Sequence, residues 1–389
     1  MVISQEDSKT IGFLRFTLTF LIVFGHMNPN TISIQEADFS LLSGQGISNA
    51  IAVGLSYLLA HAAVPVYFLM SGYLFWAGIK EWDWNVFAKK IKSRSKSLLL
   101  PYLLWNLLSI LSFVAVMFIQ DIKNNIPLDN VLEYIQSIGI RGFWDYCIWG
   151  QDKTNWIGQA IPQTGPFVIS LWFVRDLMVA TLCAPVLYWL FKKTKVWGLL
   201  LLLFCFVSKI WPQIHGFTIE SIFFFGNGLY LSMYGKGLVE EARKLRNTVL
   251  IVGLITFIIG LYFGGIKTAP GRIVFPFFAV CCVWSYVNLG AYLTNNKGIQ
   301  ISSFLIKSSF FVYVLHACPI GYFRSIISQI NTFVSGFVAH LHIPWIVYYL
   351  ISPFVIVAFC LLIYYIMERW LPHTCSLLTG NRNPSQVKK

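Results

Sequence analysis

Ten apolar segments, each about as long as a membrane crossing, constrain the fold of this 389-residue chain more than any other feature. A spanning helix needs about 20 mostly apolar residues, and helices satisfy their own backbone hydrogen bonds in lipid. The sequence therefore predicts an all-α, polytopic integral membrane protein of about 10 transmembrane helices. The fifth segment is short, so nine spans and a re-entrant piece are an alternative. The predicted spans are 10–27, 51–78, 98–119, 168–191, 196–212, 217–235, 248–266, 272–293, 304–323 and 343–367.

The composition agrees with a membrane protein and excludes several other classes. Hydrophobic residues make up 57% of the chain and charged residues 12%, whereas soluble domains carry roughly 25% charge. So little charge cannot cover a water-facing surface, which excludes a soluble enzyme and a disordered protein. The eight Cys lie mostly inside apolar segments and form no C-x-x-C pair. Neither a disulfide scaffold nor a zinc site is therefore indicated, and we expect no metal.

The net charge of +13 follows from membrane topology. An even number of spans puts both termini on one side, and most of the 29 Lys and Arg fall in the segments on that side. Lys and Arg mark cytoplasmic segments, so both termini are expected in the cytoplasm and no nucleic-acid partner is indicated. We expect a transmembrane domain at 1–371, with a long outer aromatic-rich loop at 120–167, and a short basic cytoplasmic tail at 372–389.

The first span carries two ionisable residues, Arg15 and His26. Eleven helical residues make about three turns, so both side chains lie on one face, about 16 Å apart along the axis. An arginine inside a span is costly and tends to face an interior cavity, and a histidine can act as a general base near neutral pH. The alternative is that Arg15 reaches the inner headgroups and His26 is an ordinary interface residue.

The Arg-x10-His pattern, with four further motifs in order, resembles the acyltransferase-3 family of integral membrane O-acyltransferases. The resemblance covers about residues 10–320 and includes no fused soluble domain. Each motif is weak alone, but five in order are specific. The other four are VPVYFLMSGY at 64–73, LPY at 100–102, LWFVRDL at 171–177 and SFFVYVLH at 309–316.

The resemblance implies transfer of an acyl group, most often acetyl, from cytoplasmic acyl-coenzyme A to a hydroxyl of a carbohydrate. The acceptor would be a cell-envelope glycan or its lipid-linked precursor, and the protein would lie in the bacterial inner membrane. By the same resemblance His26 would be the catalytic histidine and Arg15 its partner in the motif. As a mechanistic hypothesis, Arg15 also binds the phosphates of the donor. Direct transfer and an acyl-histidine intermediate are both compatible with the sequence.

Further candidates come from the basic stretch before the third span and from polar residues inside other spans. Arg94, Lys90 and Lys96 are candidates for the coenzyme A phosphates, since cation clusters suit them. The family often has Arg-x-x-Arg here, but this chain has serine at the second arginine position. The alternative is a basic loop against anionic lipid. Candidate cavity residues, each of which could equally be structural, are Arg175, Asp176, Tyr313, His316 and Glu220.

Two rival functions remain open from the sequence. A transporter or flippase of a lipid-linked saccharide or an anionic metabolite would also need many spans, a basic inner face and buried arginines, although no internal repeat typical of transporters is found. A non-catalytic membrane subunit is the second rival. Ser71, in the pair Ser71-Gly72, lacks a nucleophile elbow, and such a small pair in a span favours close helix packing instead.

Overall fold

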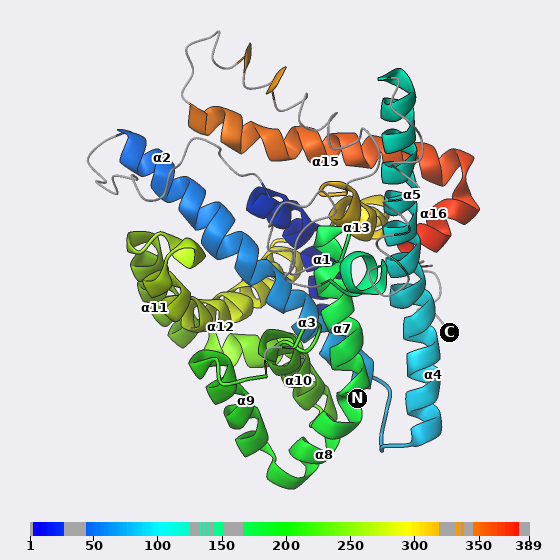
Figure 1. The fold of residues 1–389 in the computed structure, drawn as a ribbon. Helices are drawn as coiled ribbons and strands as arrows, with labels where there is room; N and C mark the ends of the chain where they lie inside the picture. Colours follow the sequence, from blue (N-terminus) through cyan, green and yellow to red (C-terminus); the bar gives the residue numbers. More distant parts are fainter. Residues whose placement is uncertain are drawn as a thin grey trace.

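The computed structural model describes residues 3–26, 44–124, 143–150, 166–212, 214–318 and 345–380, with a few single positions between them. These residues form helices and no strand, so the predicted all-α fold is confirmed for this part of the chain. Figure 1 shows a bundle in which α1 lies near the centre, α11 at one edge, and α15 crosses one end. Of the predicted outer loop 120–167, the structure describes residues 120–124, the helix η3 (Phe143–Trp149) with residue 150, residues 166–167 and a few single positions. The rest of the loop lies outside the described residues.

The first half of the chain builds one side of the bundle. It comprises α1 (Gln5–His26), α2 (Gly44–Ala52), η1 (Val53–Leu59), α3 (Ala60–Trp76), α4 (Trp84–Arg94), η2 (Ser95–Leu99), α5 (Leu100–Lys123), η4 (Ile169–Leu171), α7 (Trp172–Leu182) and α8 (Ala184–Thr194). The elements α2, η1 and α3 run on without a break, as do α4, η2 and α5.

The second half of the chain completes the bundle. It comprises α9 (Val196–Ser208), α10 (Ile219–Met233), α11 (Leu238–Tyr262), η5 (Gly265–Lys267), α12 (Ala269–Ala291), η6 (Tyr292–Asn296), α13 (Ser303–Leu315), α15 (Trp345–Trp370) and α16 (Pro372–Thr379).

Where the structure describes them, the predicted spans coincide with helix, but the count of ten is not confirmed. Six helices among the described residues are long and apolar enough to cross a membrane, and a seventh crossing results if α7 and α8 are one span bent by 54°. The other three predicted spans fall on α9, α10 and α13, which have 13, 15 and 13 described residues. Local breaks explain part of the shortening, because Lys209 adopts a left-handed conformation after α9 and Pro212 follows it.

The core forms where α3 meets α10 and where α1 meets α3, α12 and α13. Gly72 on α3 and Gly228 on α10 let the two backbones touch. A Cβ added at Gly72 would lie 1.9 Å from the Phe225 carbonyl oxygen, and one at Gly228 would lie 2.0 Å from that of Leu69. The expectation that the Ser71-Gly72 pair permits close helix packing is thus confirmed.

A buried carboxylate near the start of α1 fixes the position of that helix. Asp7 is 1% exposed, accepts a 2.8 Å hydrogen bond from the Tyr73 hydroxyl and accepts a 2.9 Å bond from the Val239 backbone N–H. Val239 is the second residue of α11, where the N–H groups of the first turn lack helical partners and attract negative charge. This one side chain therefore ties α1 to both α3 and α11.

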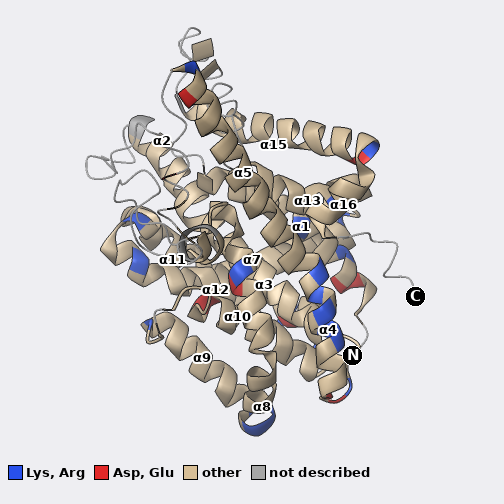
Figure 2. Ribbon diagram, turned by 45° about the vertical axis from the view of Figure 1, so that its right-hand side comes forward, with Lys and Arg blue, Asp and Glu red and all other residues tan. Residues whose placement is uncertain are grey.

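The start of the predicted tail is folded rather than extended. Residues Pro372–Thr379 form α16, which packs on α5, and the Trp105 indole N–H donates a 3.0 Å hydrogen bond to the Leu378 carbonyl. The rest of the tail lies outside the described residues. Figure 2 shows Lys and Arg along α4 and at the α8–α9 turn, at the end of the molecule where the N-terminus lies.

Candidate active site

α1 carries both residues that the first-span pattern singled out. Its buried face repeats at helical spacing, through Ile11, Leu14 and Leu18, whereas Arg15 and His26 are exposed. The helix contacts α3, α11, α12, α13 and α15, so it has neighbours on several sides. Both ionisable side chains thus lie on a side of α1 that its core contacts leave exposed. That they line a cavity stays a prediction. Their separation along the axis is about 16 Å.

His26 lies against a second histidine, His316, which follows the last residue of α13. The two ring centroids are 4.9 Å apart in an edge-to-face arrangement. His316 is 7% exposed, and its Nδ1 lies 3.0 Å from the Val312 carbonyl oxygen. A carbonyl only accepts, so Nδ1 carries the proton and Nε2 keeps its lone pair. Within the described part of the chain this Nε2 is buried without a hydrogen-bond partner.

A tyrosine from α3 holds the middle of α1. The Tyr67 hydroxyl donates a 2.5 Å hydrogen bond to the Arg15 carbonyl and lies 2.8 Å from the Thr19 hydroxyl. The Thr19 hydroxyl also donates to the Arg15 carbonyl, at 2.9 Å. This carbonyl therefore accepts from two side chains, which fixes the backbone that carries the arginine. Tyr67 was not predicted as a site residue, although it lies within the motif at 64–73.

Aromatic rings connect the two ends of the site. Tyr67 contacts Phe173 with centroids 5.7 Å apart, Phe173 contacts Tyr313 at 5.9 Å, and Tyr313 contacts His316 at 6.3 Å. The series runs from the level of Arg15 to the level of His26. Tyr313 also donates a hydrogen bond to the Ser170 carbonyl, so its hydroxyl already has a structural partner. Of the predicted cavity residues, Tyr313 and His316 thus lie in the series that ends at His26.

Three cations gather at the other end of the site. Arg94 lies close enough to Arg15 for their charges to repel, and Lys90 stands in the same relation to Arg94. Two of them donate hydrogen bonds to backbone carbonyls: Arg94 Nη2 lies 3.5 Å from the Ser71 carbonyl oxygen, and Lys90 Nζ lies 3.3 Å from the Ala77 carbonyl oxygen. None of the three forms an ion pair with a carboxylate that the structure describes. Such a cluster of cations suits an anionic ligand.

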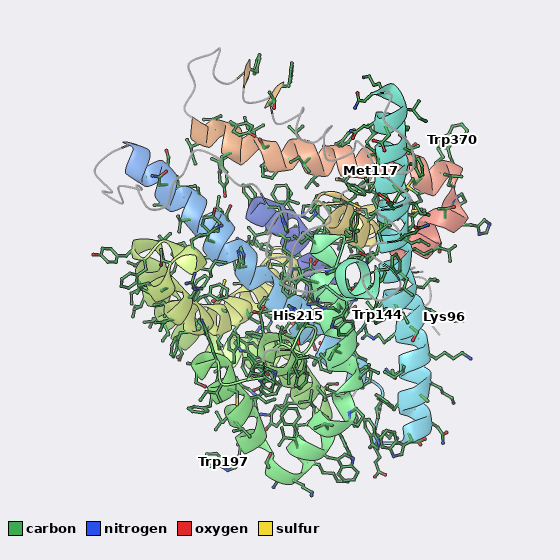
Figure 3. All side chains as sticks on the ribbon, in the orientation of Figure 1. Lys96, Met117, Trp144, Trp197, His215 and Trp370 are labelled. Atoms are coloured by element: carbon green, nitrogen blue, oxygen red, sulfur yellow. The ribbon has the colours of Figure 1, made fainter. Side chains whose placement is uncertain are left out.

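Lys96 lies apart from this cluster. It is exposed in η2, and Figure 3 places it at the junction of α4 and α5, on the outer side of the bundle. No interaction connects it with Arg15 or Arg94 in the described residues. Arg15, Arg94 and Lys90 are thus brought together and Lys96 is not. That any of the four binds the donor stays a prediction.

Arg175 and Asp176 form a buried ion pair in α7. Arg175 Nη2 is 2.9 Å from Asp176 Oδ1, and the two side chains are 3% and 0% exposed. Arg175 also donates to the Trp149 carbonyl, and Asp176 Oδ2 accepts a 3.0 Å bond from Thr218, the N-cap of α10. The pair therefore joins α7 to η3 and to the start of α10, which is the geometry of a structural network.

Glu220 lies in the first turn of α10, within electrostatic range of Asp176. It is partly buried and forms no ion pair among the described residues. No contact connects it with His26, so its predicted role in a cavity stays a prediction. Among the described residues, no three His, Cys, Asp or Glu side chains gather as metal ligands either.

Comparison with known proteins identifies the class. The model of an acyltransferase domain, that of the acyltransferase-3 family, matches residues 9–365. The chain therefore belongs to this family, and the fold and the match together define a multi-pass membrane acyltransferase.

One relative matches over nearly the whole length of the chain. Over 397 aligned residues the chain is 26% identical to the succinoglycan biosynthesis protein ExoH of Rhizobium meliloti (strain 1021), covering 96% of this chain and 92% of the relative. No solved structure matches.

Proposed function

We propose that the protein transfers an acyl group, most simply acetyl, from cytoplasmic acyl-coenzyme A to a hydroxyl of a cell-envelope polysaccharide or its lipid-linked precursor. The observation that carries the proposal is the contact of His26 with His316, in a chain that belongs to an acyltransferase family. His26 shares a face of α1 with Arg15. The name of the relative, a succinoglycan biosynthesis protein, supports a polysaccharide acceptor.

The cation cluster supports an acyl-coenzyme A donor. Coenzyme A carries several phosphate charges, and Arg15, Arg94 and Lys90 offer three positive charges without a described carboxylate partner. With the phosphates held there, the pantetheine arm extends along α1 toward His26. The aromatic series from Tyr67 to His316 then lies beside the path of the arm. In this arrangement the thioester carbon comes to the end of the site where His26 lies.

The chemical step is general-base transfer. His26 removes the proton from the acceptor hydroxyl as its oxygen attacks the thioester carbon. The carbon–sulfur bond breaks with both electrons going to sulfur, and the resulting thiolate takes the proton from the imidazolium. The products are the ester and free coenzyme A, and His26 returns to its neutral form. A direct transfer of this kind needs both substrates bound at once.

His316 positions the base. Its Nε2 is a buried acceptor with no described partner, and the His26 ring is its neighbour. A small rotation of the His26 ring lets one ring N–H donate to this Nε2, which leaves the other nitrogen of His26 unprotonated and turned to the hydroxyl. The hydrogen bond that one ring nitrogen makes selects the role of the other nitrogen. Such bonds often tighten only when substrate is bound.

The experiment uses purified protein in nanodiscs, radiolabelled acetyl-coenzyme A and an envelope-glycan extract, with label in the glycan as the readout. We expect His26→Ala to lower transfer by about 10²- to 10⁴-fold, the usual contribution of a general base, with coenzyme A binding unchanged. His373→Ala, at an exposed position of α16, is the matched control and should transfer at the wild-type rate. Equal rates in the two variants would contradict the role of His26.

A second variant separates positioning from folding. His316→Phe keeps the ring and removes the acceptor nitrogen, so we expect kcat to fall at least tenfold, which is about 1.4 kcal/mol, with KM for the donor unchanged. A rise in KM with kcat unchanged would show that His316 contributes to binding instead. If neither wild-type protein nor variants turn over acetyl-, propionyl- or succinyl-coenzyme A, the acyltransferase proposal fails.

The same proposal fixes an orientation in the membrane. The donor is cytoplasmic, so the end that holds the cation cluster faces the cytoplasm and both termini lie there, in the inner membrane of a bacterium. Labelling of single cysteines introduced at Lys193 and at Ile122 with an impermeant thiol reagent tests this orientation in a background lacking reactive native cysteines. Intact cells should label only the residue at position 122.

A further inference from the structure

A second candidate site lies away from His26, where α8 meets the connection between α3 and α4. A hollow of about 340 Å³ is lined by Glu81, Trp82, Tyr188, Trp189 and Lys192. We propose that it binds a phospholipid whose headgroup carries a primary ammonium and a phosphate, the chemistry of phosphatidylethanolamine. The proposal does not depend on the acyltransferase reaction.

The walls of the hollow are rigid. The Trp82 ring stacks on Trp76 and on Tyr188, with centroids 6.1 and 5.2 Å apart and planes 13° and 27° from parallel. Trp76 and Tyr188 stack on each other as well, at 5.0 Å. The three rings therefore pack together as one aromatic cluster beside the hollow. Two of the residues that line the hollow, Trp82 and Tyr188, are thus held in place by stacking.

The polar groups of the hollow match a zwitterion. Lys192 Nζ is held 5.1 Å from the centroid of the Trp189 ring and 5.6 Å from that of Tyr188. Neither Lys192 nor Glu81 forms an ion pair with a described residue, although both line the same hollow. Lys192 is thus available for a phosphate, and the Glu81 carboxylate for an ammonium that donates hydrogen bonds.

A buried donor adds to this match. The indole N–H of Trp82 is buried and has no hydrogen-bond partner in the described part of the chain. Buried polar groups in proteins nearly always have a hydrogen-bond partner, so a buried donor without one indicates a partner outside the chain, such as a ligand. A phosphate or ester oxygen in the hollow would supply the acceptor.

The surface beside the hollow suits acyl chains. Val186 and Trp189, one turn apart on α8, are 69% and 46% exposed. Trp189 also lines the hollow, and Lys192 follows it by one further turn. An apolar strip thus runs along α8 into a site that ends in a lysine. Tryptophan and lysine at the boundary of a membrane helix place this site at headgroup level.

The test is native mass spectrometry of delipidated full-length protein with phosphatidylethanolamine, phosphatidylglycerol or phosphatidylcholine of identical acyl chains. We expect phosphatidylethanolamine to be retained most. Lys192→Gln should lower retention of all three lipids by about tenfold, the effect of losing one charge-assisted hydrogen bond. Glu81→Gln should remove only the preference for phosphatidylethanolamine, and Trp82→Phe should weaken retention while keeping the ring.

Lys193→Gln is the matched control, since it removes the same charge from the neighbouring exposed position, which does not line the hollow. It should retain lipid like the wild type. Equal losses at Lys192 and Lys193 would reduce the site to a general basic surface and overturn the proposal. Displacement of bound lipid by AMP would assign the hollow to a nucleotide and overturn it as well. Exposed Glu81 and Lys192 can be replaced without disturbing the core, so binding is measured on folded protein.

Discussion

Replacing Gly72 by alanine is the perturbation whose cost the structure specifies most directly. The added Cβ would lie 1.9 Å from the carbonyl oxygen of Phe225 and 2.8 Å from its carbonyl carbon. Both atoms belong to the backbone of α10, so no side-chain rotation relieves the clash. The opposite contact, from Gly228 to the Leu69 carbonyl, is equally short at 2.0 Å. The two helices must therefore move apart.

The magnitude follows from the distance. Ordinary van der Waals contact begins near 3.4 Å, so the helices would have to separate by about 1.5 Å at this point. Overpacking a core costs about 1–3 kcal/mol, and more where backbone must shift, so we expect about 3 kcal/mol. At about 2.1 cal/mol/K per residue, a chain of 389 residues unfolds with an entropy of about 0.8 kcal/mol/K, so each kcal/mol shifts Tm by roughly 1.2 °C. The apparent Tm should therefore fall by roughly 4 °C. Arg94, which donates to the Ser71 carbonyl, would be displaced as well.

The assay is the fraction of monodisperse protein that survives heating in detergent, followed by size-exclusion chromatography. Gly12→Ala is the control, because a Cβ there meets only Ile306 Cδ1 at 3.5 Å, an ordinary contact. It removes a glycine from the interior of another helix and should leave stability equal or slightly higher. If the two variants melt within about 1 °C of each other, which is less than the shift for 1 kcal/mol in a chain of this length, the close α3–α10 contact is not what the structure describes.

Two further predictions concern buried polar groups. Asp176→Asn leaves Arg175 charged and buried without its partner, so it should lower the free energy of unfolding by about 3–5 kcal/mol. Glu6→Gln breaks the 3.1 Å pair with Arg243, in which both side chains are half-exposed, and should cost less than about 1 kcal/mol. Thermal melts of the two variants compare these costs. Tyr67→Phe removes the hydroxyl that holds the Arg15 carbonyl, so KM for the donor should rise several-fold with stability changed by about 1 kcal/mol. An unchanged KM would mean that the tyrosine only packs.

The helices were predictable from the sequence because long apolar segments have few alternatives in a bilayer. In the part of the chain that the structure describes, all ten predicted spans coincide with helix, including the bent segment at 168–191. Lengths were less predictable, because they depend on local breaks that hydropathy does not report. The bend between α7 and α8 falls at Cys183, between two apolar helices. Lys209 ends α9 in a left-handed conformation, which usually falls on glycine, so the sequence gives no sign of this helix end.

The sequence predicted which site residues share a face of one helix, but not which residues of different helices come together. Arg15 and His26 share a face by helical arithmetic alone, and so do Tyr313 and His316. Their meeting in space joins α1 to α13, across nearly 300 residues, and no spacing rule gives such a contact. The same holds for Arg15 and Arg94. Asp7, which lies outside all ten predicted spans, gave no signal, because a carboxylate before an apolar segment is usually solvated.

Asp7 and Tyr67 fix the position of α1, the helix that carries Arg15 and His26. One fixes the start of α1 against α3 and α11, and the other fixes its middle against α3. A helix held at two points along its axis can neither slide nor rotate, so its remaining turns carry His26 to a determined height beside His316. The positions of the cationic end and of the histidine end are then coupled through one rigid element. A change that shifts α1 at Asp7 should therefore reduce donor binding and transfer together, although it touches neither group.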